Sequence, residues 1–357
     1  MNKYTLTVIV PVYDVKKEYL DECLNSIDAQ SFRDYEVILV DDGAKGDLPG
    51  YLDKCAAGRV NYRVLHQDNQ GVAMARNNAL DIAAGEYVTF IDSDDTVRED
   101  NFEKVINKAR SQELEILFWG MNRCFPNKKV SFSPYLEDIE LFDKDRLREV
   151  QLKCMVGILP SFKAPASADA AGSACAKLYS LSFLNENRLR YIKGLKRAED
   201  MLFNLMAFGK AEGVGYICEN FYDYRQIESS ATYQYRPNGI AVFTDTLKAM
   251  REYLDKEAVD SDFMQVYYMR CMFFLLESMD MDYNNPANPK PYKDRRRELS
   301  KVTLSEPYSE AIQKLDVGNP ELAFSRKIPL ILIRFKMYDF LMLFYKIYGT
   351  LRRASGK

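Results

Sequence analysis

Several residue types and motifs that mark common functional classes are scarce or missing in this sequence. It contains one histidine, His66, so no serine–histidine triad is evident, and we expect this side chain at the surface. The seven cysteines include no CxxC motif, which argues against structural zinc. Neither GxGxxG after the first apolar run nor GxxxxGKS/T occurs, so a dinucleotide-binding or P-loop protein is not favoured.

Long apolar runs are also missing. No stretch of about 18 uncharged apolar residues occurs, so a membrane-spanning helix is not expected. The N-terminus opens directly into a strand pattern without a signal peptide, and the seven cysteines without paired spacing favour reduced thiols. The 49 basic and 52 acidic residues give an acidic chain, which argues against a nucleic-acid partner. We therefore expect a compartment that faces the cytosol.

The most informative feature is an apolar stretch that ends abruptly in acidic residues. Apolar and β-forming residues from Tyr87 to Ile91 predict a buried strand. Asp92 and Asp94 follow, and on an extended backbone both carboxylates project to the same side. A hard divalent cation relieves their repulsion and usually also binds phosphate oxygens and water. The alternative is a polar turn in which Asp94 or Asp95 caps the next helix.

The first hundred residues alternate between strand and helix patterns. Strand patterns cover 6–10, 35–40, 60–65 and 87–91, and helical patterns cover 19–27 and about 71–84. This alternation predicts an α/β fold with a mostly parallel sheet flanked by helices. Because the ends of parallel strands share one edge, the polar residues after three strands should line one crevice. They are Tyr13 and Asp14, Asp41 and Asp42, and Asp92 and Asp94.

Five short motifs occur in the order and spacing of a known family. They are Val8–Tyr13, Val40–Gly43, Asn69–Gly71 with Ala75–Asn77, Gly85–Tyr87 and Asp92–Asp95. Together they resemble the family 2 glycosyltransferases, inverting enzymes with the GT-A nucleotide-sugar fold, of the type that builds bacterial polysaccharides and envelope glycans. The resemblance is strong over residues 5–125, returns at Lys177 and 194–232, and is absent beyond about 240.

The resemblance implies a nucleotide site at the first strand ends. Pro11 and Tyr13 would hold the nucleoside, with the Tyr13 ring on the uracil or ribose; alternatively this ring only closes the top of the sheet. Asp42 would accept the uracil N3–H, which favours uracil over cytosine because N3 of cytosine is itself an acceptor. Asp41 would support the turn, and Asn69 matches a family position near the nucleotide.

The next motifs would serve the ribose, the diphosphate and the metal. Arg76 would touch the diphosphate or clamp Asp92, or it would only hold a helix to a loop. Asp92 and Ser93 would face the ribose and diphosphate. Asp94 would bind the metal, Mn²⁺ or Mg²⁺, directly, while Asp95 would cap the following helix or reach the metal shell.

An inverting transfer also needs a base on the acceptor side. The segment 194–203 resembles the second family signature, a Glu-Asp pair that opens an apolar helix. By this resemblance Asp200 is the base, and Glu199 is the alternative, with a role in capping the helix or contacting the acceptor. Without the upstream motifs, two acids in a first helical turn would be explained by the helix dipole alone.

Two further basic residues follow from the resemblance. Lys177 would be a cation that faces phosphate or acceptor, or else an ordinary surface lysine. Arg225, with the serines of Ser229–Thr232, would close over the diphosphate. Residues 160–176 are rich in Ala, Ser and Pro and are expected to form a loop that orders over the site when the donor binds.

The chain divides by pattern into three parts. Residues 1–235 form the catalytic domain, with a nucleotide-sugar half at about 1–125 and an acceptor half at about 126–235. Residues 236–323 form a helical region, and 324–357 form a basic amphipathic helix. From Arg326 to Lys357 there are eight Lys or Arg against one acid, Asp339. Such a helix can lie on an anionic membrane, or it packs on the protein or in an oligomer interface.

These observations predict a metal-dependent inverting transfer of one sugar from a UDP-sugar to a glycan hydroxyl. The acceptor is expected to be a lipid-linked oligosaccharide or envelope polymer, reached by a peripheral enzyme at the cytosolic membrane face; the formation of a homo-oligomer stays open. One rival is a nucleotidyltransferase of similar architecture, which lacks support because no Gly-rich basic first loop occurs. The other is a non-catalytic membrane-bound module, against which the acids Asp92, Asp94 and Asp200 argue.

Overall fold

A computed structural model of the chain describes residues 3–156, 169–226, 235–319, 322 and 324–354. The chain divides into two compact units. The first comprises Met1–Ile158 and Ala164–Ile227, and the second comprises Glu228–Lys357 with Leu159–Lys163.

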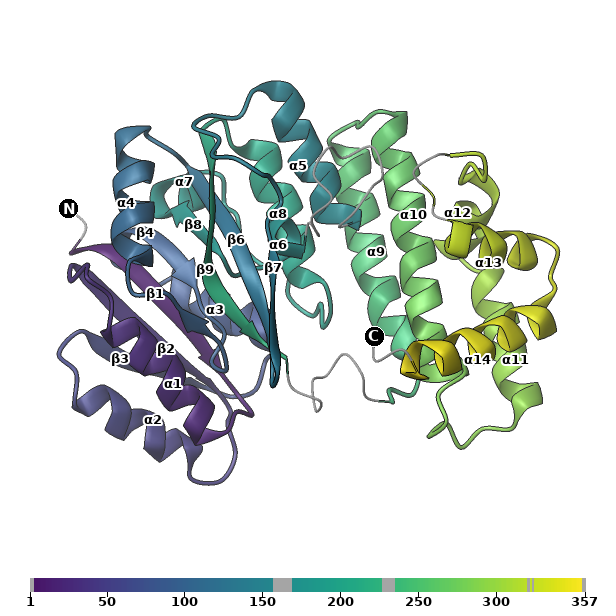
Figure 1. Ribbon diagram of the computed structural model, residues 1–357, viewed down its shortest axis with the longest axis horizontal. Coiled ribbons are helices and arrows are strands. Elements are labelled where there is room, and N and C mark those ends of the chain that lie inside the picture. Colours follow the sequence, from purple (N-terminus) through teal and green to yellow (C-terminus); the bar gives the residue numbers. More distant parts are fainter. Residues whose placement is uncertain (1–2, 157–168, 227–234, 320–321, 323, 355–357) are drawn as a thin grey trace. The chain divides into compact units, whose positions relative to one another are not determined.

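The first four strands form a parallel half-sheet in the order β3-β2-β1-β4. They are β1 (Tyr4–Val12), β2 (Tyr35–Asp42), β3 (Tyr62–Gln67) and β4 (Gly85–Phe90). Helices α1 (Lys17–Asp28), α2 (Leu48–Ala57) and α3 (Val72–Leu80) connect them (Figure 1). All four predicted strands are present, and the predicted helix over 71–84 ends at Leu80, where a turn begins.

The second half of the sheet is mixed. Strand β8 (Lys177–Ser180) lies antiparallel between β4 and β6 (Ile116–Phe125), and β6 runs parallel to β9 (Val214–Arg225). Short β5 (Thr96–Val97) pairs with β9, and β7 (Lys128–Phe132) pairs with β6, both antiparallel. The α/β class is confirmed, but parallel pairing dominates only the first four strands, because later strands enter from distant segments without the regular crossover helices.

Helices cover both faces of this sheet. Alternate residues of the central strands, such as Val8 and Val37, pack into one core with α1, α2 and α4 (Asn101–Ser111). The remaining helices of this unit are α5 (Lys144–Val156), α6 (Asp169–Gly172), α7 (Leu181–Glu186) and α8 (Glu199–Lys210). Strand β1 is buried almost throughout, as expected for a central strand between two helical layers.

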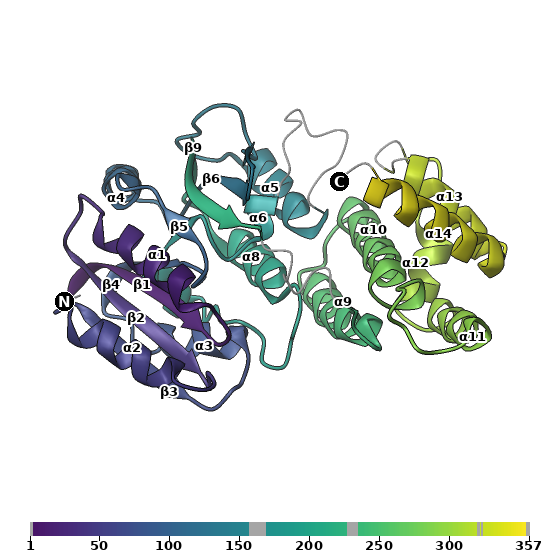
Figure 2. The same cartoon turned by 60° about the horizontal axis from the view of Figure 1, so that its bottom comes forward.

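The described part of the second unit is helical. Its elements are α9 (Gly239–Lys256), α10 (Ser261–Ser278), the π-helical turn η1 (Met279–Tyr283), α11 (Tyr292–Thr303), α12 (Tyr308–Lys314), α13 (Phe324–Arg334) and α14 (Tyr338–Ala354). Figure 2 shows α9 and α10 side by side, and Phe243 stacks on Phe274 between them at 4.3 Å. Within the residues that the structure describes, no helix has the length and apolar character needed to span a bilayer.

The predicted tail helix is in fact two helices. A break at 335–337 separates α13 from α14, and Lys336 there has a positive φ of 56°. Both helices belong to the same unit as α9–α12, so the predicted parts 236–323 and 324–357 are not separate bodies. The sequence did not reveal this break, because the amphipathic pattern, with its charged residues, continues on both sides of it.

Candidate active site

The polar residues after β1, β2 and β4 meet at one edge of the sheet, as the parallel pairing requires. The register places Val12 beside Asp41, and Ile9 beside Phe90 two residues before Asp92. This edge is where open α/β sheets bind ligands.

Tyr13 lies at a small cavity beyond the end of β1. The cavity has a volume of about 230 Å³, and its other lining residues include Lys17, Lys45 and Asp47. Tyr13 is 42% exposed, so it is accessible at this cavity. Pro11 is buried inside β1 opposite Val40, and its part in holding the nucleoside stays a prediction.

Asp42 is already engaged by the loop that precedes α3. Its carboxylate accepts hydrogen bonds from Gln67 Nε2 (2.8 Å) and from the amides of Gln70 (2.8 Å) and Gly71 (2.9 Å). Asn69 Nδ2 donates to the Asp42 carbonyl at 3.0 Å. A carboxylate offers about four acceptor positions. The three bonds leave one of these positions on the buried Asp42 carboxylate without a described donor.

The turn after Asp42 depends on a glycine. Gly43 has a φ of +71°, and a Cβ at this position would lie 2.7 Å from the backbone nitrogen of Asn69. Only glycine allows both the left-handed backbone and this close approach. The Val40–Gly43 motif thus brings the Asn69 loop against the end of β2.

Asp41 and His66 form a second contact at the same strand ends. Asp41 Oδ1 accepts the Ala44 amide at 2.7 Å, and His66 Nδ1 lies 2.7 Å from Asp41 Oδ2. His66 Nε2 lies 3.0 Å from Asp53, and the hydrogen bonds to Asp41 and then to Asp53 raise the pKa of His66. His66 is at the surface, as expected, but both ring nitrogens are occupied by carboxylates.

Arg76 joins acidic residues from two distant parts of the chain. Its side chain is buried in α3, and Nη2 donates to Asp92 Oδ1 at 2.9 Å. Nη1 lies 3.5 Å from Glu199 Oε1 at the start of α8. The guanidinium also lies 5.4 Å from the centre of the Tyr191 ring. The structure therefore places Arg76 as a clamp on Asp92 and extends that clamp to Glu199.

The three carboxylates after β4 have different surroundings. Burial, and then the nearby charge of Asp92, raises the pKa of Asp94. Asp95 is fully buried and accepts hydrogen bonds from the Tyr222 hydroxyl (2.7 Å) and the Arg225 amide (2.8 Å). Ser93, which lies between Asp92 and Asp94, is also buried.

The predicted capping role of Asp95 is wrong. The next helix, α4, begins only at Asn101, and its N-cap is Asp100. The short strand β5 comes first, and pairing of β5 with β9 brings the β9 residues to Asp95. Each Asp95 oxygen thus accepts one hydrogen bond from β9, and a part for this side chain in the metal shell stays a prediction.

The carboxylates at this edge could hold one divalent ion only if a bound diphosphate supplied further oxygen ligands. Asp92 and Asp94 supply carboxylate oxygens, which suit Mg²⁺ or Mn²⁺. Within residues 3–156, 169–226, 235–319, 322 and 324–354, no three His, Cys, Asp or Glu side chains are placed to hold an ion by themselves. A bound ion would therefore complete its shell with diphosphate oxygens and water.

Glu199, which is buried, and Asp200, which is half-buried, open α8. Burial, and then the charge of Asp200, raises the pKa of Glu199 to about 7. Burial likewise raises the pKa of Asp200, while Arg76 acts to lower it. Asp200 Oδ1 accepts the Met201 amide at 2.8 Å, one of the first amides of the helix, which have no partner within it. Ala198 precedes the pair with a φ of 54°, a left-handed conformation that is costly for a residue with a Cβ.

Lys177 is not a surface lysine. Its side chain is fully buried in β8, and Nζ donates to the carbonyl oxygens of Ser173 (2.6 Å) and Cys175 (3.4 Å). Burial lowers the pKa of Lys177 to about 8. The ammonium therefore braces the turn before β8 instead of facing solvent.

Arg225 reaches the acidic turn from β9. Its Nε donates to the Asp94 carbonyl at 2.8 Å, the guanidinium pairs with Glu22, and its centre lies 4.4 Å from the Tyr19 ring centre. The serines of Ser229–Thr232, and residues 160–168 of the expected loop, lie outside the described residues.

Comparisons with known proteins agree with this geometry. Residues 7–162 match the model of glycosyl transferase family 2. The uncharacterized glycosyltransferase EpsJ of Bacillus subtilis is 25% identical over 98% of this chain and 98% of its own length. The chain is a glycosyltransferase, and its residues 7–162 match family 2. Another relative, the poly(ribitol-phosphate) beta-N-acetylglucosaminyltransferase TarS of Staphylococcus aureus (strain Mu50), is 27% identical over 61% of this chain and 35% of its own.

A solved structure shows the same fold. The crystal structure of S. aureus TarS 1–349 in complex with UDP-GlcNAc has a TM-score of 0.65 and 21% sequence identity, with 97% of this chain and 92% of that chain covered. The GT-A type of α/β fold that the sequence motifs implied is therefore confirmed for this glycosyltransferase.

Sequence reasoning missed two residues that organise the glycosyltransferase site. The Tyr222 hydroxyl bonds Asp95 and also lies 3.1 Å from the Asp92 amide nitrogen. Asn77 exchanges two hydrogen bonds of 2.8 Å with the backbone of Tyr191 and so ties α3 to the segment before α8. The signals were present in the motifs around Ala75–Asn77 and Tyr222–Arg225, but only the folded chain shows their partners.

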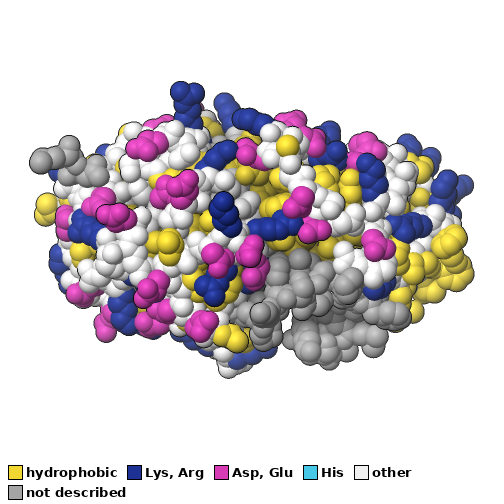
Figure 3. Space-filling model, turned by 90° about the horizontal axis from the view of Figure 1, so that it is seen from above, with side chains coloured by type: hydrophobic (Ala, Val, Ile, Leu, Met, Phe, Trp, Pro, Cys, Tyr) yellow, Lys and Arg dark blue, Asp and Glu magenta, His cyan; other side chains and the backbone are white. Residues whose placement is uncertain are grey.

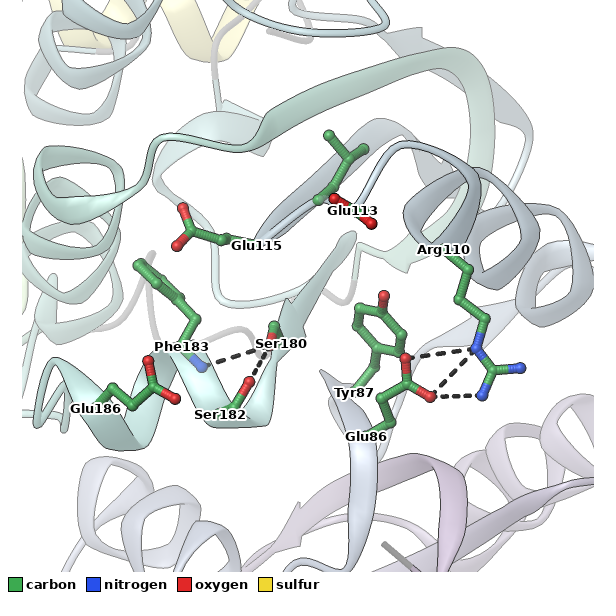
Figure 4. Close-up of a pocket in the computed structure, with 10 residues that line it drawn as sticks. Glu86, Tyr87, Arg110, Glu113, Glu115, Ser180, Ser182, Phe183 and Glu186 are labelled. Atoms are coloured by element: carbon green, nitrogen blue, oxygen red, sulfur yellow. Dashed lines mark hydrogen bonds and ion pairs between the residues drawn. The ribbon is translucent and has the colours of Figure 1, made fainter. Parts of the chain in front are cut away.

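A second cavity of the glycosyltransferase lies at the opposite edge of the sheet. It has a volume of about 340 Å³ and is lined at the amino end of β4 by Glu86 and at the end of β8 by Ser180 (Figure 4). Glu86 pairs there with Arg110 of α4, and a Cβ on Gly85 would lie 2.5 Å from the Thr7 nitrogen. The Gly85–Tyr87 motif thus serves strand packing and not the chemistry at the other edge.

Proposed function

We propose that this glycosyltransferase moves a single sugar from a UDP-sugar to a hydroxyl group of a glycan acceptor, with inversion at the anomeric carbon. The observation that supports it best is the position of Arg76 between Asp92 and Glu199. This arginine places the strand-end carboxylates, which suit a nucleotide diphosphate, next to the Glu199–Asp200 pair, which suits a proton acceptor.

The donor would lie along the edge formed by β1, β2 and β4. The exposed ring of Tyr13 offers a surface for uracil or ribose, and Asp42 has one acceptor position left for the uracil N3–H. Support from a relative comes from TarS, which was crystallised with UDP-GlcNAc.

A divalent ion would be held by Asp94, with Asp92 nearby, and would neutralise charge on the departing diphosphate. The raised pKa of Asp94 supports this role, because a group that is costly to ionise among like charges gains most from a cation. Arg225, whose Nε is bonded to the Asp94 carbonyl, adds positive charge at the same turn. Asn69 and Ser93 would line the path between nucleoside and diphosphate.

Asp200 would act as the general base. It would take the proton from the acceptor hydroxyl as that oxygen forms a bond to the anomeric carbon. The bond between that carbon and the diphosphate oxygen breaks, and UDP leaves with the electron pair. Glu199 is held by Arg76, whereas Asp200 Oδ2 accepts no hydrogen bond within the described part of the chain, which favours Asp200 over Glu199.

The acceptor would be a growing cell-surface polymer or a lipid-linked oligosaccharide at the cytosolic membrane face. The names of two relatives support a polymer acceptor, since both a Bacillus spizizenii beta-glucosyltransferase and S. aureus TarS act on poly(ribitol-phosphate). The match to family 2 disfavours the nucleotidyltransferase alternative, which would make the donor instead of consuming it.

The test is a panel of UDP-sugars incubated with the full chain, Mn²⁺ or EDTA, and membrane extract, with released UDP as the readout. We expect release from one donor only, dependent on metal and increased by extract. Binding of UDP without release from any donor would contradict a transferase reaction with these acceptors, and absence of UDP binding would overturn the donor assignment.

A further inference from the structure

Helices α13 and α14 each pack through one face on the rest of the second unit. Leu330 and Ile333 of α13, and Leu341 and Met342 of α14, are buried. The Arg334 side chain donates to the Ile312 carbonyl at 2.6 Å. These contacts agree with the alternative in which the tail packs on the protein. They also determine which side of each helix faces outward.

The outward side of these helices is apolar. Ile331 and Phe335 are four positions apart, and Phe340, Leu343 and Ile347 repeat at the spacing of one helix face. Figure 3 shows hydrophobic side chains gathered at the right-hand end of the view, with Lys and Arg beside them. The α13–α14 face consists of Ile331 (40% exposed), Phe335 (73%), Met337 (39%), Phe340 (59%), Leu343 (52%) and Ile347 (53%).

Positive charge accompanies this face. Lys336 and Lys346 are exposed among the apolar residues. The acid Asp339 is bound by Arg296 at 2.8 Å and by the Tyr292 hydroxyl at 2.7 Å, so its charge is offset locally. The segment 326–357 carries eight basic residues and one acid, a formal charge of +7, while the whole chain carries −3.

We propose that the α13–α14 face lies in the interface of an anionic membrane. Exposed phenylalanine and aliphatic side chains enter the boundary between headgroups and acyl chains, while lysines on the same side reach the anionic headgroups. A second copy seated face to face would instead bring Lys336 and Lys346 of both copies together. The membrane is therefore the occupant that the charge favours, and the inference does not depend on the proposed donor or base.

Co-sedimentation of the full chain with vesicles tests this surface. One set of vesicles is pure phosphatidylcholine and the other contains phosphatidylglycerol as well. We expect binding to the anionic vesicles that is at least about 10-fold stronger than to neutral ones and that weakens as salt is raised. Equal binding to both, or none to either, would overturn the proposal.

Matched variants locate the contact. Phe340→Ser with Leu343→Ser should lower binding to anionic vesicles by at least about 10-fold, because the apolar contact is lost. Leu136→Ser with Leu141→Ser, which changes exposed leucines of the first unit, should leave binding unchanged. Unchanged melting temperatures exclude unfolding as the cause. Equal loss in both pairs, or loss of self-association without loss of vesicle binding, would contradict a membrane role for this face.

Discussion

The two acidic groups of the site are built for different tasks. The group after β4 is a run of neighbouring carboxylates, of which Asp92 is 39% exposed by side chain and Asp95 is buried and accepts hydrogen bonds from Tyr222 and Arg225. At the start of α8, Glu199 is buried and Asp200 is half-buried, and the pKa values of both are raised. The pKa of Asp94 is raised as well, so a raised pKa does not distinguish the two groups. Their partners do: a cation relieves the repulsion between the strand-end carboxylates, whereas in the α8 pair Glu199 is held by Arg76 and Asp200 has one oxygen without a described hydrogen bond that can take a proton.

The largest expected effect comes from removing the base. Asp200→Asn keeps the size of the side chain and the bond to the Met201 amide, but it cannot accept the proton. We expect kcat to fall by about 10²–10⁴-fold, with UDP binding unchanged. Asp294→Asn, a first-turn aspartate of α11 in the second unit, is the matched control. Wild-type turnover in the Asp200 variant would contradict this assignment and favour Glu199 as the base.

Arg76 is the residue that connects the two groups, so Arg76→Ala should damage both. Loss of one partner from a buried ion pair typically costs about 3–5 kcal/mol of folding stability. Denaturant unfolding and steady-state kinetics measure the two effects. Arg76→Lys keeps the charge but loses the forked geometry and should be intermediate. Arg110→Ala, which removes an exposed pair with Glu86, should cost less than about 1 kcal/mol. Equal costs for the two alanine variants would contradict the clamp.

Asp94→Ala should separate metal binding from the rest of the strand-end group. The Mn²⁺-dependent gain in UDP affinity should fall by at least about 10-fold, measured by calorimetry with Mn²⁺ or EDTA. Asp95→Asn should keep that gain, because the Asp95 oxygens serve Tyr222 and Arg225. An unchanged gain in the Asp94 variant would remove this residue from the metal site.

The pH dependence should report the acceptor side. Folding raises the pKa of Glu199 from 4.5 to about 7, so the folded chain holds the extra proton between these values and stability falls as pH rises through them. Folding lowers the pKa of Lys177 from 10.5 to about 8, so stability rises with pH over that range. We expect activity to rise near pH 7, as the Glu199–Asp200 pair ionises, and to fall above about 8, as Lys177 loses its proton.

Variants at these two positions assign the limbs of the pH profile. Glu199→Gln should move the rising limb, and Lys177→Arg should remove the falling limb. Profiles that keep both midpoints in both variants would show that other groups control the rate.

Local patterns in the sequence predicted the parts of the site that depend on strands and their ends. The four early strands and the shared edge of Tyr13, Asp42 and Asp92 follow from alternation and parallel pairing alone. The resemblance added the Glu199–Asp200 pair, and the structure places it beside Arg76.

The errors concern contacts between distant positions. Asp95 bonds residues 127 and 130 positions further along the chain, so no local rule separates it from an N-cap. Lys177 is buried because β8 lies between β4 and β6. The sequence of this four-residue strand does not predict these pairings. The tail pattern likewise indicated an amphipathic helix without showing that one side is packed and the other is exposed.

The smallest expected effect concerns backbone strain before the base. Ala198 has a φ of 54° and a ψ of 26°, and a left-handed residue with a Cβ costs about 1–2 kcal/mol. Ala198→Gly removes this cost, but glycine also makes the unfolded chain more flexible, by about 0.4–1 kcal/mol. The expected net result is a stabilisation of at most about 1.6 kcal/mol in urea unfolding. Ala176→Gly, with a φ of 57° before Lys177, is the matched variant. If the strain holds the Glu199–Asp200 pair in position, the Ala198 variant alone should also lose several-fold in kcat; destabilisation of both variants would show that neither backbone is strained.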